Sequence, residues 1–229
     1  MNQNPTSSGS GLLRNVDDLR GPAGRIEALL NMGRAEAAYA ALGCHPHPLF
    51  GGTMHNKVVY HAMKAFQAYG LPVLRFNFRG AGLSEGTHDH GRGEVTDTRI
   101  ALDWLQREYQ LPLLFAGFSF GSSVGLRACC GDERVKGIVS LGLPVKAGGR
   151  EYHYSCLSGC PQPKLFISGD ADEYGPRTGV EAAVAGAAPP ADLLMIPGAD
   201  HFFAGKLEPM QQALMAWLKQ RFEFPEASL

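Results

Sequence analysis

The feature that most constrains this chain is a repeated alternation of strand-like apolar runs with helix-like segments. Strand patterns occupy residues 71–78, 111–118, 135–143, 164–169 and 192–197, and helix patterns occupy residues 54–70, 93–109, 120–130, 179–187 and 208–222. Such alternation predicts an α/β fold, with a mostly parallel sheet, right-handed crossovers and helices on both faces. Because ligands bind beyond the carboxyl ends of such strands, functional side chains are expected in the loops at those ends.

The N-terminal part of the chain supplies further strands. Residues 24–33 and 35–44 are apolar runs separated by a glycine-containing turn, and this pattern predicts a hairpin that leads into a central strand. The polar residues 1–14 are expected to form a flexible tail. Residues 15–229 are expected to form a single domain, because a chain of 229 residues can bury one sizeable core.

Composition and charge exclude several classes of partner. The formal net charge is -1 and neither sign forms a block, which argues against nucleic acid or an anionic membrane surface as a partner. No run approaches the roughly 20 apolar residues of a membrane span, and the polar start lacks the apolar region of a signal peptide. We therefore expect a cytoplasmic protein that acts on a small molecule. The oligomeric state stays open.

The cysteines and histidine clusters carry no strong metal or cofactor signal. Five cysteines lack zinc-finger spacing, so reduced structural thiols are expected, and the spacing of Cys156 and Cys160 is only a weak indication of a disulfide. The segments HPHP and HDH look like metal ligands, but no cysteine or carboxylate cluster completes either of them. We predict neither a metal nor a cofactor.

The segment GFSFG places Ser119 between Gly117 and Gly121, where a strand pattern gives way to a helix pattern. A nucleophile elbow needs small neighbours at these positions, because its serine adopts a strained backbone conformation that crowds them. The free N–H groups at the start of the helix would favour negative charge at the same place. Ser119 is therefore a candidate nucleophile, although a tight strand-to-helix turn alone would explain the same glycine spacing.

An acid and a base follow Ser119 in the chain order expected of this kind of sheet. The loop after residues 164–169 carries Asp170, Asp172 and Glu173, and the loop after the next strand carries His201. A serine hydroxyl needs a base, and that base needs a carboxylate to orient it. All three groups are thus available at the carboxyl ends of predicted strands.

A hydrolytic serine also needs preset N–H donors for the developing oxyanion. Phe120, which follows the candidate nucleophile, supplies one of them by its position. A second is expected from the HPHPL segment, in which Pro46 and Pro48 have no N–H, so that His47 or Leu49 remains.

Six motifs, HPHPLFGGTM, RFNFRGAGLSEG, DHGRGE, GFSFG, GDADE and GADHFFAGK, together resemble those of the α/β-hydrolase superfamily. The resemblance is to its small, lidless bacterial serine hydrolases and esterases, and it covers nearly the whole chain. It implies an α/β-hydrolase fold, with a central sheet of about eight strands and no large cap domain.

The same resemblance assigns roles to particular residues. It implies Ser119 as the nucleophile, His201 as the base and Asp172 as the acid, because the family acid is the third residue after the glycine of the GDAD loop. His47 stands at the last position of the family's His-Gly-X oxyanion pattern, and Pro46 replaces its glycine. His47 and Phe120 are therefore the expected oxyanion donors.

The loop between residues 135–143 and 164–169 has about 20 residues, which is too short for a helical lid, so the site is expected to be open. Phe50, Tyr152 and Tyr154 could line a substrate pocket, or they could form an exposed aromatic loop. The function predicted is hydrolysis of small carboxylic esters through an acyl-enzyme. Thioesters or amides would use the same groups, and a non-catalytic binding protein on the same fold is an alternative of another class.

Overall fold

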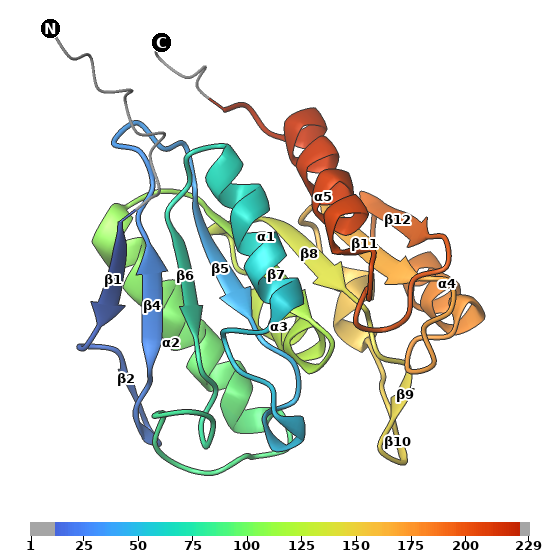
Figure 1. Cartoon of the computed structure of the whole chain (residues 1–229), viewed down its shortest axis with the longest axis horizontal. Helices are drawn as coiled ribbons and strands as arrows, with labels where there is room; N and C mark the ends of the chain where they lie inside the picture. Colours follow the sequence, from blue (N-terminus) through green and yellow to red (C-terminus); the bar gives the residue numbers. More distant parts are fainter. Residues whose placement is uncertain (1–11, 225–229) are drawn as a thin grey trace, which may run out of the picture.

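The fold is organised around one central sheet (Figure 1). The computed structural model describes residues 12–224. In spatial order, the eight strands of this sheet are β1 (Leu13–Val16), β4 (Ala28–Asn31), β6 (Val73–Phe76), β5 (Ala40–Cys44), β7 (Leu113–Phe118), β8 (Val135–Leu141), β11 (Lys164–Gly169) and β12 (Ala191–Ile196). The strands from β6 to β12 run parallel, whereas β4 is antiparallel to both β6 and β1. The predicted mostly parallel sheet is confirmed.

Helices cover both faces of the sheet, as predicted. Those of the described residues are α1 (Lys57–Ala68), α2 (Arg92–Tyr109), α3 (Phe120–Cys129), α4 (Arg177–Ala185) and α5 (Leu207–Arg221). One buried core, which includes Phe66 of α1 and Leu214 of α5, fills the space on one face; a second, with Trp104 of α2 and Val124 of α3, fills the other. Figure 1 shows α1 and α5 in front of the sheet and α2 behind it. None of these helices is both long and apolar enough to cross a bilayer.

The predicted N-terminal hairpin is wrong. β4 and β5 do not pair with each other, because β6 lies between them. Every residue of β5 is buried, whereas buried and half-buried residues alternate in β4. A strand that is buried on both faces belongs in the centre of a parallel sheet, which is where β5 lies. The hairpin that does form joins two very short strands, β2 (Arg20–Gly21) and β3 (Gly24–Arg25).

The sheet also begins earlier than the predicted domain boundary at residue 15. β1 starts at Leu13, which pairs with Asn31, and Arg14 pairs with Leu30. Pairing of these two residues with β4 places them inside the domain. Residues 1–11 of the predicted tail lie outside the described residues.

The cysteines serve mainly as core side chains. All five are free thiols, so Cys156 and Cys160 form no disulfide. Burial raises the pKa of the Cys44 and Cys129 thiols, which favours the neutral thiol over the nucleophilic thiolate. These two side chains therefore pack as small apolar groups.

The segment between β8 and β11 forms a small projection. It contains a two-stranded hairpin, β9 (Lys146–Ala147) and β10 (Arg150–Glu151), followed by a short 3-10 helix, η2 (Ser155–Gly159). Figure 1 shows this hairpin projecting beyond the edge at which the parallel strands end. Within residues 12–224 no large cap domain covers that edge, as expected from the length of the segment.

The close packing of α3 on β7 leads to a stability prediction. A Cβ atom at Gly125 would overlap the ring of the fully buried Phe115. Alanine favours a helix over glycine by about 1 kcal/mol, but overpacking a core costs about 1–3 kcal/mol. We expect Gly125→Ala to lower the free energy of unfolding by about 1 kcal/mol, measured by urea denaturation.

Gly159→Ala is the matched control, because nothing lies within 4 Å of a Cβ atom at Gly159. This variant should keep the stability of the wild type. A Gly125→Ala protein as stable as the wild type would contradict the packing argument.

Candidate active site

The candidate nucleophile lies on a sharp turn between β7 and α3. Ser119 has φ 54° and ψ -117°, a left-handed backbone conformation that residues with a Cβ atom rarely adopt. Two backbone hydrogen bonds hold the turn: Ser119 N donates to Leu141 O at 2.9 Å, and Ser123 N donates to Ser119 O at 3.1 Å. The serine is half-buried and lines a cavity, so its hydroxyl is accessible to a small molecule.

Close backbone contacts explain both glycines of the GFSFG segment. A Cβ atom at Gly117 would lie 2.5 Å from the carbonyl oxygen of Gly121. A Cβ atom at Gly121 would lie 2.7 Å from the carbonyl oxygen of Cys44, and closer still to that of His45. Only glycine fits at either position. At Gly117 the end of β7 is packed against the start of α3, and at Gly121 the start of α3 is packed against the end of β5.

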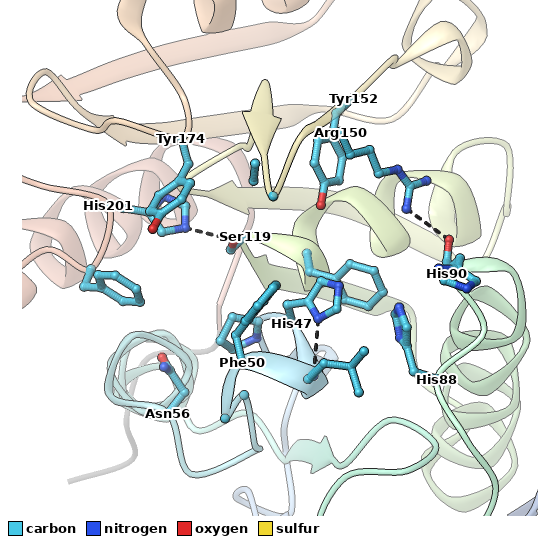
Figure 2. Close-up of a pocket in the computed structure, with 18 residues that line it drawn as sticks. His47, Phe50, Asn56, His88, His90, Ser119, Arg150, Tyr152, Tyr174 and His201 are labelled. Atoms are coloured by element: carbon cyan, nitrogen blue, oxygen red, sulfur yellow. Dashed lines mark hydrogen bonds between the residues drawn. The ribbon is translucent and has the colours of Figure 1, made fainter.

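Ser119, His201 and Asp172 form one hydrogen-bonded line. His201 Nε2 lies 2.9 Å from Ser119 Oγ, and His201 Nδ1 lies 2.8 Å from Asp172 Oδ2. Because a carboxylate only accepts hydrogen bonds, Nδ1 carries the proton and Nε2 is left to accept from the serine hydroxyl. Figure 2 shows the imidazole of His201 directed at Ser119. This is the arrangement that a serine nucleophile, its base and an orienting acid require.

The carboxylate of Asp172 is fixed by its own backbone neighbours. Its Oδ1 atom accepts hydrogen bonds from Tyr174 N at 2.8 Å and from Gly175 N at 3.0 Å. Asp172 is buried, and these two donors replace the water that its charge has lost. Oδ2 is thereby left free to face His201.

The two other acidic residues of this loop do not contact His201. Asp170 Oδ1 accepts from Gly198 N at 2.7 Å, and Glu173 is exposed. In addition, Ala171 N donates to Ala199 O at 3.0 Å. These contacts join the loop after β11 to the loop after β12, and they hold Asp172 and His201 at a fixed separation.

The structure distinguishes the two alternative oxyanion donors in the loop after β5. Leu49 N already donates to His47 Nδ1 at 3.3 Å, whereas His47 N donates to no other group in the described residues. The N–H of Phe120, the first residue of α3, has no partner within the helix. The rings of His47 and Phe120 lie 4.7 Å apart, which places the loop over the elbow. His47 and Phe120 thus remain the pair we propose.

His45 fixes the conformation of this loop. Its Nε2 atom accepts from Phe78 N at 2.9 Å, so Nδ1 carries the proton and donates to Pro46 O at 2.6 Å. Burial lowers the pKa of His45 to about 4, and the imidazole therefore keeps the neutral form that these two bonds need at neutral pH.

A cavity of about 620 Å³ opens beside Ser119 (Figure 2). It is lined by Pro46, His47, Leu49, Phe50, Gly51, Gly52, Asn56, His88, His90, Ser119, Phe120, Ala147, Gly148, Arg150, Tyr152, Tyr174, His201 and Phe202. Phe50 and Tyr152, predicted to bind substrate, are both among these residues. Their role in substrate binding stays a prediction.

Tyr154, the third residue predicted to bind substrate, does not line the cavity. Its hydroxyl donates to Pro144 O at 2.5 Å, and its ring packs against the core on the α3 side of the sheet. Tyr154 is the N-cap residue of η2, and η2 contacts α3. The chain therefore turns toward the core at Tyr154 and not toward the cavity. Burial accordingly raises the pKa of Tyr154.

Part of the cavity wall was not predicted from the sequence. His88 and His90 come from the loop before α2, and Arg150 comes from β10. Glu94 of α2 accepts from Gly91 N at 2.8 Å and lies 2.8 Å from His88 Nδ1, outside the geometry of a hydrogen bond. These contacts hold the histidine loop against the cavity. In residues 12–224 no group of histidine, cysteine and carboxylate side chains is arranged to hold a metal ion.

The site consists of a serine on a strand-to-helix elbow, and a histidine links this serine to a carboxylate. This is the architecture of the serine hydrolases among α/β proteins. Residues 50–220 match the alpha/beta hydrolase domain family, and the chain belongs to that family. An uncharacterised protein of Rickettsia prowazekii is 38% identical over 205 residues, which cover 86% of each chain. The resemblance noted in the sequence is thereby confirmed.

Two solved structures are similar over nearly the whole chain. An α/β serine hydrolase homologue from Coxiella burnetii has a TM-score of 0.81 at 34% identity, covering 93% of this chain and 100% of its own. A protein from Xanthomonas campestris, described as an α/β serine hydrolase without a lid, has a TM-score of 0.80 at 31% identity, covering 97% and 100%. Similarity to a lidless structure agrees with the short segment between β8 and β11.

The geometry around His201 predicts different effects for two neighbouring aspartates. Asp172→Asn should remove the acceptor that fixes the His201 tautomer and lower kcat for p-nitrophenyl acetate by about 10⁴-fold. Asp170→Asn is the control, because it retains an acceptor oxygen for Gly198 N and does not contact His201. Steady-state kinetics would contradict the assignment if Asp172→Asn kept its rate, or if both variants lost the same amount.

Proposed function

We propose that the protein is a serine hydrolase that cleaves small carboxylic esters through an acyl-enzyme intermediate. The observation that carries this proposal is the hydrogen-bonded line from Ser119 through His201 to Asp172 at the wall of an accessible cavity. Strained backbone at a non-glycine residue costs about 1–3 kcal/mol. Covalent catalysis best explains why a serine with a strained backbone is hydrogen-bonded to a base that is itself hydrogen-bonded to an acid.

In the acylation step, Ser119 Oγ attacks the ester carbonyl carbon while His201 Nε2 takes the hydroxyl proton. The carbonyl oxygen becomes an oxyanion, which accepts hydrogen bonds from the N–H groups of Phe120 and His47. Asp172 stabilises the imidazolium that forms. His201 then gives the proton to the leaving alkoxide, and the ester bond breaks.

In the deacylation step, a water molecule takes the place of the alcohol. His201 removes a proton from this water, which attacks the acyl-enzyme carbonyl and forms a second oxyanion at the same two N–H groups. Collapse of this intermediate returns the proton to Ser119 Oγ and releases the acid. The sequence of steps uses only groups of the chain, so a small-molecule ester and water are the only reactants required.

The compartment expected from the sequence is also part of the proposal. The free state of all five cysteines agrees with a reducing compartment such as the cytoplasm. The cytoplasmic location stays a prediction, as does the expectation that neither nucleic acid nor membrane is a partner.

Two serine-to-alanine variants test the proposed nucleophile. Ser119→Ala should abolish labelling by a fluorophosphonate probe and reduce hydrolysis of p-nitrophenyl acetate by several orders of magnitude, because the variant has no attacking oxygen. Ser123→Ala, one turn further along α3, is the control and should label like the wild type. Circular dichroism should show both variants folded. Absence of labelling and turnover in the wild type would instead favour a binding protein on the hydrolase fold.

The short segment between β8 and β11 predicts kinetics without interfacial activation. A lid that opens on lipid would need a longer mobile segment than the one over this site, so there is no large apolar surface to uncover. Rates on p-nitrophenyl esters should be highest for short acyl chains, and rates on a triglyceride should not jump when an emulsion forms. A maximum at long chains, or such a jump, would contradict the open-site interpretation.

A further inference from the structure

The cavity beside Ser119 is electrostatically one-sided. Among the described residues, its walls contain one arginine and several histidines, but no aspartate or glutamate. Arg150 forms no ion pair within residues 12–224; one of its N–H groups donates to His90 O at 3.3 Å, and its guanidinium lies 5.2 Å from the ring centre of Tyr152. A guanidinium has five N–H donors, so Arg150 keeps donors available for a ligand.

Ring contacts connect Arg150 to the elbow in a continuous row. The His47 ring lies 4.7 Å from that of Phe120 and 4.6 Å from that of His88. His88 in turn lies 5.2 Å from His90, whose carbonyl oxygen contacts Arg150. This row of side chains, from His47 to Arg150, is here called the basic arm of the cavity.

The basic arm lies on the opposite side of Ser119 from the base. Figure 2 shows His201 and Tyr174 on one side of Ser119, and His88, His90 and Arg150 on the other. His201 must reach the leaving-group oxygen in order to protonate it, so the leaving group lies on the His201 side. The acyl group of a bound ester therefore extends along the basic arm.

We propose that the substrate's acyl group carries a terminal carboxylate that Arg150 binds, so that the preferred substrates are monoesters of dicarboxylic acids. This inference rests on the proposed esterase function and specifies its substrate class. A carboxylate matches the planar fork of a guanidinium and can accept two parallel hydrogen bonds from it.

The surrounding charges favour the same ligand. Burial is the main cause that lowers the pKa of His47 to about 4; the neighbouring His88 and Arg150 lower it further, whereas Glu94 raises it. Arg127, which donates to Gly91 O, has its pKa lowered by burial and by Arg150. Glu94, the buried carboxylate near this loop, is occupied by backbone N–H groups and by His88. Within residues 12–224, Arg150 is the one arginine or lysine that lines the cavity, and an anionic acyl terminus would give its guanidinium the ion-pair partner that it lacks there.

A charge series of substrates tests the proposal. The p-nitrophenyl monoester of adipic acid, the neutral p-nitrophenyl hexanoate and the corresponding ω-amino ester have the same leaving group and acyl chains of similar length. We expect kcat/KM to be about tenfold higher for the adipate monoester than for the hexanoate, since hydrogen bonds to charged groups are worth at least this factor. The ω-amino ester should be the slowest of the three. Each rate is divided by the rate of alkaline hydrolysis, to remove intrinsic reactivity.

Two variants in the β9–β10 hairpin test the role of Arg150. Arg150→Gln should reduce the adipate-to-hexanoate ratio of kcat/KM by about tenfold. Lys146→Gln is the matched control: it removes a positive charge from β9 of the same hairpin, but Lys146 is exposed and does not line the cavity. The control should keep the wild-type ratio. A ratio near one in the wild type, or an equal change in both variants, would overturn the proposal while the esterase function stands.

A binding measurement separates this proposal from the proposed function. Adipate itself should bind to the wild type and to Lys146→Gln, but not to Arg150→Gln, as measured by isothermal titration calorimetry with hexanoate as the neutral-tail comparison. If no ester is cleaved, the esterase proposal fails, and selective adipate binding still supports the carboxylate site. If adipate binds no better than hexanoate, the carboxylate site is rejected.

Discussion

The backbone contact between the elbow after β7 and the end of β5 is the constraint on which the rest of the site depends. Because Gly121 and the carbonyl groups of Cys44 and His45 are too close for any intervening side chain, the two loops cannot move independently. This contact joins the loop that carries His47 to the elbow that carries Phe120, and the rings of these two residues lie 4.7 Å apart. β5 and β7 are neighbours in the centre of the sheet and all of their residues are buried, so the strained backbone at Ser119 is supported by buried strands. The candidate nucleophile and the proposed oxyanion donors are thus positioned by one packing arrangement.

A second contact of the same kind positions the candidate acid and the candidate base. A Cβ atom at Gly169 would overlap the carbonyl oxygen of Ala199, which already accepts a hydrogen bond from Ala171 N. Since β11 and β12 are parallel neighbours, their loops leave the sheet side by side. Asp172 and His201 therefore meet although 29 positions separate them in the chain. At both places a glycine lets two backbone segments come into contact, and this contact fixes the positions of the polar side chains in the two loops.

Much of this arrangement could be predicted from sequence, and the failures have identifiable causes. The helices and parallel strands follow from long periodic patterns, and Ser119 and His201 follow from the rule that functional loops lie at carboxyl ends of strands. For the acid, that rule leaves Asp170, Asp172 and Glu173 as alternatives, and the family resemblance alone implies Asp172. The order of β4 and β5 in the sheet was not predictable, because local turn patterns do not report that β6 inserts between them.

The directions of side chains in the loops also could not be predicted from the sequence. The sequence places Tyr152 and Tyr154 in one aromatic segment, but only the tertiary contact of η2 with α3 shows that Tyr154 turns into the core. Likewise, His90 and Arg150 are far apart in the chain and meet only because the histidine loop and the β9–β10 hairpin line the same cavity. The charge of the basic arm is therefore a property of tertiary structure.

In the proposed mechanism, this charge has two opposite effects on catalysis. Positive charge there stabilises the oxyanion, but it would oppose the imidazolium that forms at His201. Because Arg150 and His201 lie on opposite sides of Ser119, Arg150 still stabilises the oxyanion but opposes the imidazolium less strongly. The lowered pKa of His47 prevents a further positive charge from arising between Arg150 and His201.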